Sequence, residues 1–167
     1  MSIRTSALLF FLFTSFLLNA QSPLTPGFTM LETGKFNDAK VFFEHYLESD
    51  GQNPTALLCY GRALGLSGNP TKALEVFGDL KKKSPDSYEV ALNIAEAYMW
   101  SKDYSIAKSH YEELVKRDST SFSANLGLAN ANSELKDYDS ALKYIGKALE
   151  IQPTNGNALT SQKFMFL

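Results

Sequence analysis

The side chains in this sequence that could do chemistry are two histidines, one cysteine and a run of three lysines. His45 and His110 are far apart in the chain, whereas a general base or a zinc pair needs groups held in a defined mutual geometry. Cys59 has no second cysteine for a disulfide or a multi-cysteine zinc site, and we expect it to be a small buried hydrophobe. We therefore predict that the protein is not an enzyme and holds no metal and no cofactor.

The lysine run and a set of glycines are the remaining features that could bind an anion. The lysines, residues 81–83, fall where a helix is expected to end, and positive charge there complements the helix dipole and its free carbonyls. A phosphate-binding loop would follow a strand, but Gly61, Gly65 and Gly68 follow none. We interpret the lysines as a solvated helix end and the glycines as helix-packing and turn positions.

Four short segments of the chain read alike and recur with one period. They are GKFNDA at 34–39, GNPTKA at 68–73, KDYSIA at 102–107 and KDYDSA at 136–141. Their final alanines are 34 residues apart, with no insertion or deletion. A small residue stands twelve positions before each alanine, and a bulky residue stands four positions after it. The alanine column is Ala39, Ala73, Ala107 and Ala141; the small column is Gly27, Gly61, Ala95 and Ala129; the bulky column is Phe43, Phe77, Tyr111 and Ile145.

This pattern resembles the tetratricopeptide repeat family, whose unit is a helix, a tight turn and a second helix. The resemblance covers about residues 22–155 and implies an all-α, right-handed α-solenoid of about four repeats plus a C-terminal helix. We expect helix pairs at 25–33 with 36–49, 54–67 with 70–83, 87–100 with 104–117 and 121–135 with 138–151, and a ninth helix from about Asn155. The units within 21–155 are then about 20–53, 54–87, 88–121 and 122–155, followed by a capping or truncated fifth-repeat helix at 156–167.

The residue types supply a physical reason for this arrangement. Two helices can approach closely only where the contact residues are small, so we expect Gly61 to face Ala73 and Ala95 to face Ala107. Two asparagines of the fourth repeat, Asn125 and Asn132, fall on predicted core positions and need hydrogen-bond partners if they are buried.

Residues at the expected helix ends favour the same boundaries. Pro70 suits the first turn of a helix, where a missing N–H costs nothing. Pro23 and Pro26 predict that the first helix is short or starts late. We expect N-caps at three polar residues, Asn69, Asp103 and Asp137.

The first twenty residues have the layout of a cleavable signal peptide. A single charge, Arg4, precedes an apolar run over 7–18, and Leu18-Asn19-Ala20 stands before Gln21. The run is shorter than the ~20 apolar residues that span a bilayer. Removing residues 1–20 leaves 15 basic against 18 acidic side chains (16 − 1 = 15), so the formal charge changes from −2 to −3. We predict an extracytoplasmic protein, periplasmic or secreted after cleavage near Ala20; an uncleaved amphipathic or anchor helix is the alternative.

The first helices of the repeats should line the concave face of the stack, with residues four apart projecting together. The predicted partner-binding groove consists of Leu58, Arg62, Leu66, Leu92, Glu96, Met99, Trp100, Leu126, Asn130 and Glu134. Two alternatives stay open. Leu58, Leu92 and Leu126 could instead pack between repeats, and Trp100 could fill the gap between neighbouring repeats instead of anchoring a partner.

Dispersed basic residues and a formal charge of −2 argue against a nucleic-acid partner. We predict a non-catalytic protein–protein interaction scaffold of the cell envelope that binds a protein or peptide, and no small-molecule substrate, along this groove. The alternative is the N-terminal repeat module of a longer envelope protein, for example one with an outer-membrane β-barrel, that docks its own missing domain. The apolar end, Phe164, Met165, Phe166 and Leu167, predicts self-association if it is uncovered.

Overall fold

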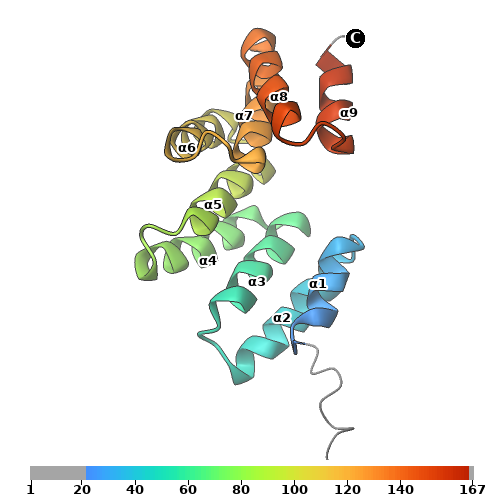
Figure 1. Cartoon of the computed structure of the whole chain (residues 1–167). Coiled ribbons are helices and arrows are strands. Elements are labelled where there is room, and N and C mark those ends of the chain that lie inside the picture. The colour runs from blue at the N-terminus through green and yellow to red at the C-terminus, as the bar shows by residue number, and fades with distance from the viewer. Residues whose placement is uncertain (1–21, 166–167) are drawn as a thin grey trace, which may run out of the picture.

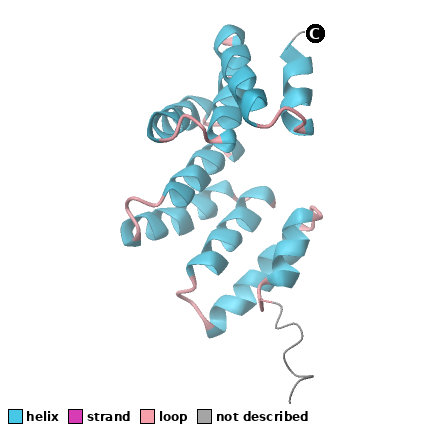
Figure 2. Cartoon of the chain, in the orientation of Figure 1, coloured by secondary structure: helices cyan, strands magenta, loops and turns pink. Residues whose placement is uncertain are grey.

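The computed structural model describes residues 22–165, and the side chains of residues 22–163. Over this range the chain forms α-helices and no strand (Figure 2). The helices are α1 (Thr25–Glu32), α2 (Phe36–Ser49), α3 (Pro54–Leu66), α4 (Pro70–Lys83), α5 (Tyr88–Trp100), α6 (Tyr104–Arg117), α7 (Phe122–Glu134), α8 (Tyr138–Ile151) and α9 (Gly156–Met165). The expected helix bounds are confirmed to within one residue. The expectations for residues 1–20 and for the side chains of the apolar C-terminal end lie outside the described residues.

The helices form a solenoid with two layers. Each helix packs against the next one along the chain, and each odd-numbered helix from α1 to α9 also contacts the next odd-numbered helix (Figure 1). Among the described residues the even-numbered helices have no such contacts with one another. Closer spacing in one layer bends the stack toward that layer, so the odd-numbered helices form its inner, concave side.

The periodic residues make up the buried contact between the two layers. All four alanines of the alanine column have no exposed surface, and the small residues Gly27, Gly61, Ala95 and Ala129 are buried. The bulky column is also buried, with Phe43, Phe77 and Ile145 at 0% exposure and Tyr111 at 3%. The repeat therefore fixes the helix contact at the same three positions in each unit.

The two glycines of the small column leave room for aromatic rings. We expected Gly61 to face Ala73, but the atoms closest to it belong to Phe77, whose Cε1 would lie 2.3 Å from an added Cβ. Gly27 has the same relation to Phe43, at 2.5 Å from Cζ. In the first two units the ring of the second helix thus lies directly on the backbone of the first helix.

The turn inside each unit has one backbone conformation at one position of the repeat. Gly34, Gly68, Lys102 and Lys136 stand 34 residues apart, and their φ angles are +74°, +91°, +64° and +64°. Glycine adopts this left-handed conformation freely, whereas a side chain makes it less favourable. The two lysines are therefore strained positions in an otherwise regular fold.

A column of side-chain caps starts four of the odd-numbered helices, α3, α5, α7 and α9. Asn53, Ser87 and Ser121 accept hydrogen bonds from the N–H groups three residues later, at 3.0, 3.2 and 3.3 Å. Asn155 accepts in the same way from Ala158, at 3.2 Å. These residues are again 34 apart, and they satisfy N–H groups that a helix start leaves free.

The expected caps of the even-numbered helices are only partly confirmed. Asn69, Asp103 and Asp137 all occupy the N-cap position. Only Asp137 makes the side-chain bond, which it accepts from the N–H of Ser140 at 3.2 Å. The tight turn before these helices therefore does not by itself orient the N-cap side chain toward the free N–H groups of the first helical turn. Pro70 is at the first position of α4, as expected.

The predicted polar core positions of the fourth repeat are buried. The amide Nδ2 of Asn125 donates to the carbonyls of Ser119 and Ser121 at 3.0 and 2.8 Å, and that of Asn132 donates to Leu128 at 2.8 Å. Their Oδ1 atoms have no hydrogen-bond partner among the described residues. The amide hydrogens thus find partners within α7 and the turn before it.

Candidate partner-binding site

A cavity of about 310 Å³ opens on the concave layer, where α5 packs against both α3 and α7. Three odd-numbered helices supply eight of its lining residues, and α6 supplies one. The lining consists of Arg62, Leu66, Glu96, Met99, Trp100, Tyr111, Ser123, Gly127 and Asn130.

A polar column crosses this cavity. Arg62, Glu96 and Asn130 occupy one position of the repeat, 34 residues apart, and so stand on α3, α5 and α7 in turn. The Nη1 atom of Arg62 lies 3.6 Å from Oε2 of Glu96. This distance is an ion pair but exceeds that of a good N–H···O hydrogen bond.

The carboxylate of Glu96 is held in an unfavourable setting for its charge. Burial raises its pKa, and attraction to the Arg62 guanidinium offsets this only in part. The Oε2 atom is shielded from solvent and has no hydrogen-bond partner among the described residues. The side chain as a whole is 26% exposed, and it lines the cavity.

Two aromatic rings form the walls of the cavity, and each rests on a glycine of a neighbouring helix. A Cβ on Gly65 of α3 would lie 1.9 Å from Cε3 of Trp100, and one on Gly127 of α7 would lie 2.3 Å from Cε1 of Tyr111. Burial, and next the charge of Glu96, raise the pKa of the Tyr111 hydroxyl, which therefore stays protonated. Both rings are fixed by backbone contact.

The structure places six of the predicted groove residues on the cavity, namely Arg62, Leu66, Glu96, Met99, Trp100 and Asn130. Leu58 is instead buried in the core beside Phe77 and Val90. Leu92 and Leu126 are half-buried against the next two core clusters. Because odd-numbered helices touch one another directly, a residue one turn earlier than the polar column falls between two helices. Glu134 is exposed at the end of α7, away from the cavity lining.

Three lining residues, Tyr111, Ser123 and Gly127, were missed by sequence reasoning. Tyr111 belongs to the bulky column and was assigned to the core alone. The signal that could have revealed its second role is Gly127, a glycine inside a helix that no column of the repeat explains. Gly127 does mark a close approach, by the Tyr111 ring, although the helix glycines Gly78 and Gly146 have open space around them.

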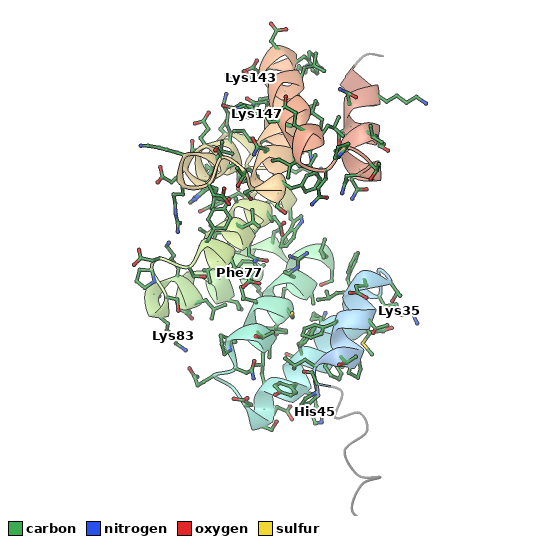
Figure 3. The ribbon with its side chains drawn as sticks, in the orientation of Figure 1. Lys35, His45, Phe77, Lys83, Lys143 and Lys147 are labelled. Carbon is green, nitrogen blue, oxygen red and sulfur yellow. The ribbon has the colours of Figure 1, made fainter. Side chains whose placement is uncertain are left out.

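The side chains that first suggested chemistry lie elsewhere. His45 pairs with Glu48 at 2.9 Å on the exposed surface of α2. Figure 3 shows His45 at the opposite end of the stack from Lys143 and Lys147 of α8. The imidazole of His110 stacks on Tyr98 at 5.2 Å, and its pKa is lowered by burial and then by Lys81.

The remaining candidates also have structural surroundings. Cys59 is half-buried, and burial raises the pKa of its thiol, which makes the reactive thiolate scarcer. The run 81–83 closes α4, where Lys82 pairs with Asp79 at 2.9 Å on the surface. Over the described range, histidine, cysteine and acidic side chains form no group of three that could hold a metal ion.

None of the helices in that range is both long and apolar enough to cross a bilayer.

Comparison with known proteins gives a consistent family resemblance. The sequence model described as "Tetratricopeptide repeat" matches residues 92–156. Tetratricopeptide repeat protein 21A of Mus musculus is 30% identical over 115 residues, which is 68% of this chain. The chain spans only 9% of the length of that relative.

Solved structures agree with the fold. A thermophilic tetratricopeptide repeat protein of Thermus thermophilus is 20% identical and superimposes with a TM-score of 0.77. The superposition covers 86% of this chain and 79% of the Thermus chain. MamA of Desulfovibrio magneticus is 19% identical and covers 86% of this chain and 81% of its own, with a TM-score of 0.65. The first repeat domain of human RPAP3 is 20% identical and covers 68% of this chain and 89% of its own, with a TM-score of 0.63.

Proposed function

Because this chain is a tetratricopeptide repeat protein, we propose that it is a non-catalytic scaffold of the cell envelope that binds a partner polypeptide in its concave groove. Repeat proteins of this class bind protein or peptide partners through the extended concave surface that stacking creates. The finer parts of the proposal, the location and the binding surface, rest on features of this chain.

The observation that supports the groove is the cavity across α3, α5 and α7. It combines two fixed aromatic walls with the polar column Arg62, Glu96 and Asn130. A long polypeptide segment needs both kinds of group, because apolar side chains bury on the rings while backbone amides seek hydrogen bonds. The three helices, together with Tyr111 of α6, present this combination around one cavity.

Binding is tested by a variant that alters the cavity and leaves the core intact. Asn130→Ala, on the cavity, is compared with Lys116→Ala, on the exposed surface of α6. Both proteins are checked for an unchanged melting temperature, and each is used to capture partners from an envelope fraction. We expect the same bound polypeptide with the parent and with Lys116→Ala, and a clear loss with Asn130→Ala. Equal capture by all three proteins would contradict a role for the groove.

The location is supported by the signal-like layout of residues 1–20 alone. The test fuses these residues to a reporter enzyme that is active only outside the cytoplasm. We expect activity, and an N-terminus beginning near Gln21 in the exported product. An inactive reporter would contradict the envelope location, and an active reporter that retains residues 1–20 would favour the anchor helix.

The second candidate is a repeat module within a longer envelope protein. It is favoured by the mouse relative, of which the chain matches only 9%. In this case the groove or the apolar end, residues 164–167, docks against another part of the same protein. Deleting residues 157–167 tests the end: if it mediates self-association, the parent forms concentration-dependent oligomers and the deletion variant does not.

A further inference from the structure

We infer that the cavity accepts a positively charged side chain, lysine or arginine, of the bound polypeptide, with Glu96 as its counter-ion. This inference rests on the proposed function, because it names the chemistry of the segment that the groove would bind. It concerns the pocket between Trp100 and Tyr111 and not the whole concave surface.

The charges that line the cavity favour a cation. The cavity is lined by two charged residues, Arg62 and Glu96, and they differ in how far their charged groups are solvated. Arg62 is 43% exposed, so its guanidinium is well solvated. Glu96 is mostly buried, its Oε2 has no hydrogen-bond partner among the described residues, and Arg62 stays 3.6 Å away. The anion is therefore compensated only in part, and a cation entering the cavity adds to that compensation.

The walls of the cavity also suit a long cationic side chain. Trp100 and Tyr111 line the same cavity as the carboxylate. Aromatic faces attract ammonium and guanidinium groups, and the aliphatic stem of lysine or arginine buries well against Leu66 and Met99. A volume of about 310 Å³ is at the small end for ligand pockets. It suits one long side chain better than a whole folded surface.

Neutral variants of Arg62 and Glu96 should change the affinity for a cationic ligand and for an anionic ligand in opposite directions. A cation beside Glu96 is repelled by the nearby guanidinium, so Arg62→Gln should strengthen its binding, whereas Glu96→Gln should weaken it by about tenfold, the scale of one charge-assisted hydrogen bond. An anionic ligand would show the reverse pattern. Glu96→Gln keeps the size of the side chain, and Arg62→Gln shortens a side chain that is 43% exposed, so the packing of α3 and α5 is preserved.

The experiment selects binders from a random linear peptide library on the folded chain and measures synthetic copies through the fluorescence of Trp100, the single tryptophan. We expect the selected peptides to share a lysine or arginine. Replacing arginine by citrulline, which is neutral and of the same shape, should weaken binding to the parent about tenfold and change binding to Glu96→Gln little.

Each outcome decides between the two claims. Peptides that bind the cavity with no loss on citrulline replacement would overturn the inference and leave the proposed function standing. Peptides that bind Arg62→Gln more weakly and Glu96→Gln more tightly than the parent would also overturn it, because the pocket would then recognise an anion. A folded chain that selects no peptide at all would count against the proposed function itself, and the inference would fail with it.

Discussion

The indole of Trp100 lies directly on the backbone of Gly65, so the end of α5 is seated on α3 of the preceding unit. The sequence left open whether this residue anchors a partner or fills the gap between repeats. The structure shows that it fills the gap and also lines the cavity with the rest of its surface. Its position therefore couples the shape of the candidate site to the packing of two units.

Gly65→Ala should displace this ring. An added Cβ would lie 1.9 Å from Cε3 of Trp100, and because the indole is rigid the helices must move apart. We expect a loss of about 1–3 kcal/mol in the free energy of unfolding and a red-shifted tryptophan emission. The control is Gly78→Ala in α4, where an added Cβ meets nothing within 4 Å, so helix propensity should leave the protein equally or more stable. Equal stability of the two variants would contradict the seat on Gly65.

Ala107→Glu should unfold or strongly destabilise the protein. Ala107 has 0% exposure in the contact between α5 and α6, so the replacement overfills the contact and buries an unpaired charge. The cost should exceed the ~1–3 kcal/mol of overpacking alone. The neighbouring Ile106 is 45% exposed, and Ile106→Glu should leave the thermal unfolding curve nearly unchanged. An unchanged curve for Ala107→Glu would mean that the helix contact is wrongly placed.

Lys102→Gly should stabilise the turn between α5 and α6. The φ of +64° is unfavourable for a side chain by roughly 1–2 kcal/mol, and the greater freedom of glycine in the unfolded chain offsets part of the gain. We expect a net increase of about 0.5–1 kcal/mol in chemical denaturation. The same replacement within a helix, Lys116→Gly in α6, should instead cost about 1 kcal/mol. A loss at both positions would argue against the left-handed turn.

Ser87→Ala should cost about 1 kcal/mol, because the hydroxyl accepts a hydrogen bond from the N–H of Val90 at the start of α5. Asn69 stands at the N-cap of α4 without such a bond, so Asn69→Ala should cost less. Denaturation midpoints of the two variants give the comparison. If both lose the same stability, the cap column of the odd-numbered helices has no special role.

Glu96 makes stability depend on pH in a defined direction. Its pKa is raised above the ordinary 4.5, so the folded state holds the proton more tightly than the unfolded chain does. The free energy of unfolding therefore falls as pH rises from the ordinary value through the raised one. Melting curves of Glu96→Gln and the parent should differ little below about pH 4 and favour the variant near about pH 7. A variant less stable than the parent at neutral pH would show that the pair with Arg62 outweighs burial.

Helix positions could be predicted from the sequence because three columns with a 34-residue period place each helix and its buried face. The column Asn53, Ser87 and Ser121 was equally periodic, but its residue types suit both turns and caps, so spacing alone did not assign it. Side-chain orientation across helices was harder. The helical periodicity of α3 and α5 does not reveal that direct contact between these helices buries Leu58. It also does not reveal that the Tyr111 ring packs on Gly127 of the next unit.

Every helix contact in the described chain joins elements that are next or next but one to each other. Folding then needs only short loops to close, which favours fast formation that can begin in any unit. It also lets the terminal helix pairs open while the middle stays closed. Within the same range no direct contact ties α3 to α7, so a ligand across the cavity would be the link that makes those units open together. Amide hydrogen exchange in α3 and α7 would then slow in parallel when the groove is filled.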